Sequence, residues 1–139
     1  MGKVQVMDVV LDTNVVVSGL LFGRVPGKIV SLWKKGTITP FVSKEIIDEY
    51  VRVLAYPKFQ LGEHEIEYLI YKEILPYFEV ITPRSHTPVL SEDPTDDKFI
   101  HCALTKSIST IISGDRHLLD LKYYKSIAIF TPEEFLKRM

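Results

Sequence analysis

Acidic side chains that could hold a metal ion recur at four separated places in the sequence. Asp12 and Asp115 each come close behind a short apolar run, Glu49 lies in a stretch with helical spacing, and Asp96 and Asp97 adjoin another such stretch. Like charges 4 Å apart repel by about 4 kcal/mol near a protein surface, so gathering these groups requires a cation. Mg²⁺ and Mn²⁺ take oxygen ligands and can activate water against a phosphodiester. The pattern predicts metal-assisted hydrolytic phosphoryl transfer.

Glu49 is the least ordinary of these acids. It shares a helix face with the apolar Ile46 and Tyr50, where another apolar residue is expected. Asp48 is the ordinary case, because it can pair with Arg52 at i+4 on the solvated side of the same helix. The contrast favours a functional role for Glu49.

Each acid also has a purely local interpretation. Asp12 and Asn14 could be turn or N-cap residues, Asp96 could be a first-turn residue favoured by the helix dipole, and Asp115 could be a turn aspartate after a glycine. Glu49 could lie at the rim of its apolar face. The convergence of all four places on one edge favours chemistry over four independent accidents.

Short β-branched runs alternate with helical patterns along the chain. The predicted strands are Val4–Leu11, Ile38–Val42, Phe78–Ile81, Thr110–Ser113 and Ile127–Phe130. The predicted helices are Val15–Leu21, Pro26–Lys35, one capped by Ser43 and ending before Pro57, one from about Glu63 to Leu75, one from near Thr95, His117–Leu121, and one with a capping box at Thr131–Glu134. A loop containing Pro83, Pro88 and Pro94 is expected to be exposed.

This alternation predicts an open parallel α/β sheet with helices on both faces. In such sheets ligands lie beyond the carboxyl ends of the strands. Asp12 and Asp115 both follow predicted strands, so we expect them to face the same crevice.

Composition sets limits on the function. The 139 residues, 46% of them hydrophobic, predict one domain over residues 1–139, and no apolar run is long enough for a membrane span, so a cytoplasmic protein is expected. The single cysteine, Cys102, excludes an internal disulfide and a cysteine-based zinc site. A formal net charge of −1 gives no general electrostatic argument for nucleic-acid binding, so local chemistry must supply one.

Four segments together carry a family resemblance. They are VVLDTNVVVSG (Val9–Gly19), SKEIIDEYVRVLAYPKF (Ser43–Phe59), DPTDDKFIHCAL (Asp93–Leu104) and IISGDRHLLDL (Ile111–Leu121). In order and spacing the sequence resembles PIN-domain proteins, specifically the prokaryotic VapC-like ribonucleases that are toxin components of toxin–antitoxin systems. The resemblance spans Val6 to about Phe135.

The resemblance implies a three-layer α/β/α Rossmann-like sandwich with a central parallel sheet, in which acids bind Mg²⁺ or Mn²⁺ and cleave single-stranded RNA. It implies four catalytic acids, Asp12, Glu49, Asp96 and Asp115. Asp97 could replace its neighbour Asp96 as a metal ligand. We expect Asp12, Asp96 and Asp115 to hold the metal. Glu49 would orient or deprotonate the attacking water.

Supporting roles follow in the same way. Asn14 and Ser113 would hold metal-bound water, and contacts to the RNA backbone are expected from Arg116 first, then Arg52 and Lys28. Arg24 and Lys58 are further candidates for such contacts. The resemblance also implies a cognate antitoxin as partner and a homodimer.

Two other functions fit part of the pattern. A haloacid-dehalogenase-like phosphatase would use Asp12 as nucleophile, but Asn14 stands where that class needs an acidic proton-transfer residue. A non-catalytic module that binds RNA or protein would use the same fold without turnover. Metal-dependent cleavage, a phospho-aspartyl intermediate, or binding that persists in chelator would distinguish the three.

Overall fold

Parallel strands rich in β-branched residues form the centre of the molecule. The computed structural model describes residues 6–84 and 94–139. β1 (Met7–Leu11) pairs in parallel with β2 (Ile38–Val42) on one side and with β4 (Thr110–Ile112) on the other. The sheet order is β3-β2-β1-β4-β6-β5, completed by β3 (Glu79–Val80), β6 (Ile127–Phe130) and β5 (Tyr123–Tyr124). The carboxyl ends of β1 and β4 therefore adjoin.

The strand predictions hold at the centre of the sheet and fail at one edge. Ile38–Val42 and Ile127–Phe130 are confirmed residue for residue, whereas the strand predicted at Phe78–Ile81 is reduced to two residues. The predicted parallel sheet is confirmed for the other strand pairs, and an unpredicted edge strand, β5, pairs antiparallel with β6. β5 is too short to carry a periodic signal, and it is joined to β6 by a tight turn in which Lys125 has a φ of 54°. The predicted start of the first strand, at residues 4 and 5, lies outside the described residues.

Helices fill the connections between the strands. They are α1 (Thr13–Phe22), α2 (Arg24–Lys35), α3 (Lys44–Leu54), α4 (Glu63–Tyr68), α5 (Asp97–Thr105), α6 (Arg116–Leu121) and α7 (Pro132–Lys137). Single turns of 3₁₀-helix span Pro57–Phe59 and Pro94–Asp96, and a π-helical segment, η2 (Leu69–Ile74), continues α4.

Local capping chemistry accounts for where several helices begin. The Ser43 hydroxyl accepts a hydrogen bond from the backbone N–H of Ile46 at 3.3 Å, which confirms it as the N-cap of α3. The capping box at α7 is also present, with reciprocal bonds of 3.0 and 3.1 Å between Thr131 and Glu134. At the end of α2, Gly36 takes the left-handed conformation with a φ of 78°, which a glycine adopts without steric cost.

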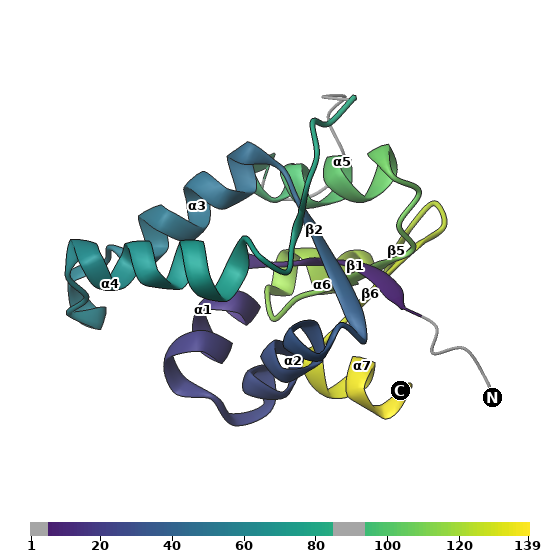
Figure 1. Cartoon of the computed structure of the whole chain (residues 1–139). Coiled ribbons are helices and arrows are strands. Elements are labelled where there is room, and N and C mark those ends of the chain that lie inside the picture. Colours follow the sequence, from purple (N-terminus) through teal and green to yellow (C-terminus); the bar gives the residue numbers. More distant parts are fainter. Residues whose placement is uncertain (1–5, 85–93) are drawn as a thin grey trace.

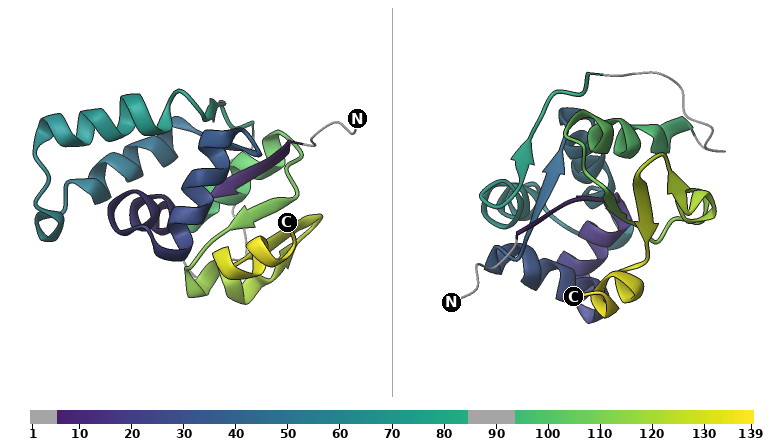
Figure 2. Two further views of the ribbon diagram at one scale, coloured as in Figure 1. Left: turned by 60° about the horizontal axis from the view of Figure 1, so that its bottom comes forward. Right: turned by 90° about the vertical axis from the view of Figure 1, so that its right-hand side faces the viewer.

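The layers are a sheet between two groups of helices (Figures 1 and 2). α5 packs on β1, β2 and β4 from one side, while α2 and α7 lie across the other face, as the right-hand view of Figure 2 shows. α3 runs beside α4, away from the sheet, in both Figure 1 and the left-hand view of Figure 2. This is the three-layer α/β/α arrangement that the sequence predicted.

The core fixes these layers through large buried side chains. Trp33, Tyr50, Phe99 and Phe135 are all nearly or completely buried. The Tyr50 hydroxyl donates to the Leu11 carbonyl at 2.9 Å, so α3 is tied to the last residue of β1. Burial raises the pKa of Tyr50 well above its usual value, so this donor keeps its proton.

Two other predictions are only partly covered by the described residues. Of the loop expected to be exposed, Pro83 is partly buried, Pro88 lies outside the described residues, and Pro94 begins a helical turn. Within the described ranges, no single helix is long and apolar enough to cross a membrane, although α1 and α2, bent by 97° at their junction, pass that test as a pair.

Candidate active site

The first acid, Asp12, lies buried at the carboxyl end of β1. Its backbone N–H continues the strand ladder by donating to the Ile112 carbonyl at 3.0 Å, and its side chain is 4% exposed. Although Asp12 occupies the N-cap position of α1, its carboxylate makes no capping bond to that helix within the described structure. Oδ2 instead accepts the Ser113 hydroxyl at 2.6 Å. Asp12 is therefore the N-cap of α1 by position, as the local interpretation has it, but its carboxylate is held by Ser113.

Ser113 connects two of the predicted acids. Its hydroxyl is completely buried, donates to Asp12, and accepts the backbone N–H of Asp115 at 2.9 Å. Asp115 in turn accepts the backbone N–H of His117 at 2.7 Å and so caps α6. For Asp115 the local interpretation is correct, but it does not exclude a second role for the other carboxylate oxygen.

A third acid, Asp96, reaches the same place from the N-cap position of α5. Potential ligand atoms of Asp96, Asp115 and His117 all lie within 4.8 Å of one another. Asp96 and Asp97 are equally buried, but among the described residues Asp97 is not part of this grouping. The geometry thus favours Asp96 over Asp97 as the partner of Asp115.

The electrostatics of Asp12 reflect this crowding. The pKa of Asp12 is raised from 3.8 to about 6, mainly by burial and in smaller part by the charges of Asp115 and Glu49, while the hydrogen bond from Ser113 partly offsets the increase. At neutral pH Asp12 is therefore an ionised carboxylate held in surroundings that disfavour its charge. This is the kind of perturbed group that marks functional sites.

Glu49 is directed inward from α3 by three donors. The Thr13 hydroxyl donates to Oε2, and the Lys98 ammonium lies 2.8 Å from Oε1. Arg52 approaches the same Oε1 at 3.5 Å. The acid on the apolar helix face is thus explained, because its carboxylate joins α3 to α1 and α5.

A protein-family model described as PIN domain matches residues 8–117. The chain belongs to the PIN-domain family. Proteins of this family are generally metal-dependent nucleases. No curated protein sequence matches the chain.

Two solved structures share the PIN-domain fold with this chain. PAE2754 from Pyrobaculum aerophilum superposes with a TM-score of 0.59 at 15% identity, covering 95% of this chain and 94% of that one. FitAcB from Neisseria gonorrhoeae superposes with a TM-score of 0.55 at 16% identity, covering 90% of this chain and 98% of that one. At such low identity the likeness concerns the fold alone.

Lys98 is the residue of this PIN domain that sequence reasoning missed. Its side chain is 6% exposed, and besides pairing with Glu49 it donates to the Thr95 carbonyl. A lysine in the first turn of a helix normally has a solvated ammonium group. Because its partner lies 49 positions earlier, on a different helix, no local pattern indicates the pair.

His117 is a second residue that the sequence did not single out. The nearness of its ring to Asp96 and Asp115 gives it a place among the potential ligands. Its position two residues after Asp115, in the first turn of α6, is the signal that could have indicated this.

One predicted ion pair is wrong. Asp48 pairs with Lys44 at 3.0 Å rather than with Arg52, and Arg52 approaches Glu49 instead. Positions i+3 and i+4 are both neighbours on a helix, so Arg52 had two acids within reach. Glu49 lies toward the crowded acids, where a cation reduces the repulsion.

The remaining predicted residues lie around the acids or apart from them. Asn14 is exposed in the first turn of α1, and Arg116 is exposed at the start of α6, next to Asp115. Lys28 is exposed on α2, the helix that packs on α1, β2 and α7. Within the described residues neither Arg116 nor Lys28 forms an ion pair with the acids.

Proposed function

We propose that this PIN domain is a divalent-metal-dependent endoribonuclease that cleaves single-stranded RNA. The observation that carries the proposal is the gathering of Asp12, Asp96 and Asp115 at one edge of the sheet. Burial and acidic neighbours there raise the pKa of Asp12 to about 6. A bound cation would offset this unfavourable charge, and family membership independently supports a metal-dependent nuclease.

The donor atoms fit Mg²⁺ or Mn²⁺. Asp12, Asp96 and Asp115 would hold the ion, with Asp97 as the neighbouring carboxylate and His117 within reach of the same group. Carboxylate oxygens suit both ions, whereas an imidazole nitrogen suits Mn²⁺ better than Mg²⁺. When bound, such an ion supplies positive charge to phosphate oxygens and lowers the pKa of water.

The side chains around the ion would fix the orientation of its ligands and of the attacking water. Ser113 holds Asp12 through its hydroxyl and is itself fixed by the backbone N–H of Asp115. A carboxylate has about four acceptor positions, so Glu49 can still accept a hydrogen bond from water beside its three protein donors. We assign it the orientation of the attacking water, with Asn14 as a further polar contact.

The RNA backbone would meet positive charge on the same side. Arg52 already approaches Glu49, and Arg116 follows Asp115 directly, so both are suited to phosphate contacts. Lys28 on α2 would contact phosphates farther along the strand. These contacts would fix the register of the strand without reading its bases.

The biological setting we propose is that of a toxin in a toxin–antitoxin pair acting on cytoplasmic RNA. Its support is the resemblance of the four sequence segments to that group of PIN-domain proteins. A cognate antitoxin and a homodimer follow from the same resemblance. Light scattering that detects only a monomer at all concentrations would contradict the dimer.

The test is cleavage of end-labelled single-stranded RNA with Mg²⁺, with Mn²⁺ and with EDTA. We expect cleavage that requires the metal and is lost in Asp12→Asn. The matched control is Asp120→Asn. It removes an exposed acid from α6, the helix that Asp115 caps, and should leave cleavage within twofold. Equal cleavage by wild type and Asp12→Asn would indicate a contaminating ribonuclease.

The two alternatives predict different results in the same experiment. A binding module retains RNA in EDTA and never cuts it. A phosphatase hydrolyses p-nitrophenyl phosphate and forms a phospho-aspartyl group on Asp12. Either result would overturn the proposed function.

A further inference from the structure

A groove with aromatic walls adjoins the acids. It lies between α1 and the end of α3 with the turn that follows, encloses about 410 Å³, and is lined in part by Asn14 and Val53. Asn14 follows Thr13 directly, and Val53 lies one turn after Glu49. Since Thr13 and Glu49 are in hydrogen-bond contact, the groove begins where the acid cluster ends.

Two of the three aromatic side chains that line this groove are exposed to solvent. The side chains of Phe22 and Tyr56 are 61% and 43% exposed. Phe22 also faces Phe59, with ring centroids 5.9 Å apart and planes inclined by 52°. Single exposed apolar residues are common on protein surfaces. Here, in contrast, three aromatic rings line one groove, and the groove lies beside the proposed site of phosphodiester cleavage.

The polar part of the groove indicates the kind of ligand. The Lys58 ammonium lies 5.1 Å from the centroid of the Phe59 ring, at the groove lining, and Asn14 contributes an exposed amide. Arg52, with a side chain that is 64% exposed, lies one residue before Val53 on the same helix. Flat apolar faces with an amide and cations nearby match a nucleotide, whereas an apolar peptide would leave those cations without a partner.

We propose that this groove holds one unpaired nucleobase of the RNA strand, next to the scissile phosphate. The base stacks on Phe22 and Tyr56, Asn14 contacts its polar edge, and Lys58 contacts the adjoining phosphate. The inference rests on the proposed function and explains why the protein would select single-stranded over double-stranded RNA. A base in a duplex is already paired and stacked, so it cannot enter the groove.

The first experiment measures RNA binding in an Asp12→Asn background, where the strand stays intact. Tyr56→Ala and Phe22→Ala remove exposed rings, so folding should be preserved, and circular dichroism checks it. Stacking on an aromatic side chain contributes enough that its loss should raise the Kd for a fluorescent single-stranded oligoribonucleotide roughly 5- to 150-fold. The matched control is Tyr71→Ala on η2, which removes a 64% exposed ring that does not line the groove and should change the Kd less than twofold.

The second experiment removes the base instead of the ring. A series of oligoribonucleotides carries one abasic nucleotide at successive positions, and binding to the Asp12→Asn protein should weaken at one position. In Asp12→Asn/Tyr56→Ala the same abasic nucleotide should cause no further loss, because the contact is already absent. A merely structural role for Tyr56 would give independent, multiplicative losses and would overturn the proposal.

The outcomes separate this inference from the proposed function. If wild type neither binds nor cleaves single-stranded RNA with either metal, both fail. If it binds and cleaves, but Phe22→Ala and Tyr56→Ala do so equally well, only the nucleobase subsite fails. The exposed aromatic groove would then be available to a protein partner.

Discussion

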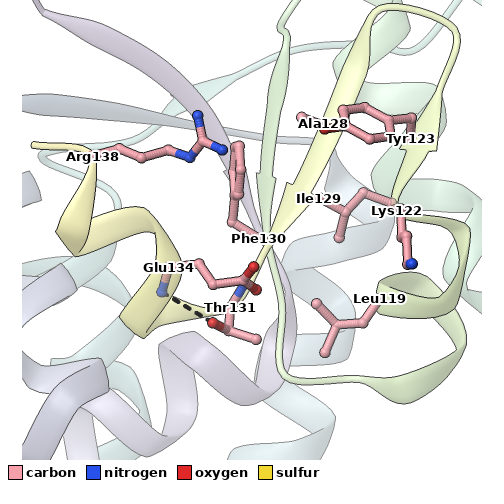
Figure 3. A pocket seen from close by; sticks show the side chains of 9 residues that line it. All are labelled: Leu119, Lys122, Tyr123, Ala128, Ile129, Phe130, Thr131, Glu134 and Arg138. Carbon is pink, nitrogen blue, oxygen red and sulfur yellow. Dashed lines mark hydrogen bonds between the residues drawn. The ribbon is translucent and has the colours of Figure 1, made fainter.

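Two carboxylates, Asp12 and Glu134, show how different surroundings give the same chemical group different roles. Asp12 is buried beside other acids, and its pKa is raised to about 6. Glu134 lies in the pocket between β6 and α7 (Figure 3), where hydrogen bonds from the Thr131 backbone and hydroxyl lower its pKa. The first group carries an unfavourable charge and the second a stabilised one.

The pocket beside Glu134, here called the C-terminal pocket, has one acid, Glu134, among the described residues that line it. It encloses about 290 Å³, and its polar groups serve structure: Thr131 and Glu134 cap α7, while the Arg138 guanidinium lies 4.5 Å from the Phe130 ring centroid. In Figure 3 the Thr131–Glu134 bond lies at one wall of this pocket. The shape of a pocket is therefore a poor guide to the active site of this protein. The unfavourable charge of a buried carboxylate such as Asp12 is a better one.

The largest expected difference between the two carboxylates is the loss of RNA cleavage in Asp12→Asn. We expect RNA cleavage to fall at least about 1000-fold, equivalent to about 4 kcal/mol of transition-state stabilisation. The same variant should be more resistant to urea than wild type in EDTA at pH 7, because an amide can accept the Ser113 hydroxyl without a buried charge. A less stable, fully active variant would contradict the contrast between the two carboxylates.

The next largest effect concerns the buried cation. Lys98→Met should lower the free energy of unfolding by about 3 kcal/mol, since removing one partner leaves the other charge buried. Urea denaturation measures the change. The matched control, Lys44→Met, breaks an exposed pair with Asp48 and should cost less than about 0.5 kcal/mol. Similar losses in both variants would show that Lys98 does not balance the acids.

A smaller effect is expected from pH. The folded pKa of Asp12, about 6, exceeds its ordinary value of 3.8, so the folded state binds this proton more tightly than the unfolded state. The destabilisation is therefore complete above pH 6 and disappears as the pH falls toward 4. From pH 7 to pH 5 the metal-free protein should gain about 1 kcal/mol relative to Asp12→Asn.

Urea denaturation of both proteins in EDTA at each pH gives this difference. Saturating Mn²⁺ should oppose the gain, because binding to the ionised carboxylates stabilises wild type most at the higher pH. If the difference between wild type and Asp12→Asn does not vary with pH, the charge of Asp12 is not unfavourable.

The smallest effect is expected in the C-terminal pocket. Tyr123→Ala removes a 67% exposed ring from its lining and should change stability by less than about 0.5 kcal/mol. RNA cleavage should stay within twofold of wild type. A tenfold loss of cleavage would mean that this pocket takes part in the function and that the comparison is wrong.

The sequence was sufficient to predict the parts of the site that follow from strand topology. Asp12 and Ser113 come directly after buried strands, and parallel neighbouring strands must end at the same edge of the sheet. Glu49 was indicated by its place on an apolar helix face. In each case the signal is local, and the fold class supplies the rest.

The features that were missed depend on packing between distant segments. Lys98 meets Glu49 only because α3 and α5 lie together, and β5 exists only because a short turn returns the chain beside β6. Nothing in the residues near Lys98 distinguishes it from a solvated lysine. The assignment of Arg52 to Asp48 failed for a more local reason, since Lys44 and Glu49 on the same helix offered alternative partners.

The hydrogen bond between Asp12 and Ser113 joins residues 101 positions apart in the chain. β1 leaves the ribosome early, but its neighbour β4 belongs to the last quarter of the sequence. The edge that we propose as the metal site cannot assemble until synthesis has reached α6, because Ser113 and Asp115 are missing before then. The ribonuclease that we propose would therefore stay inert while it is still being translated, surrounded by messenger, transfer and ribosomal RNA.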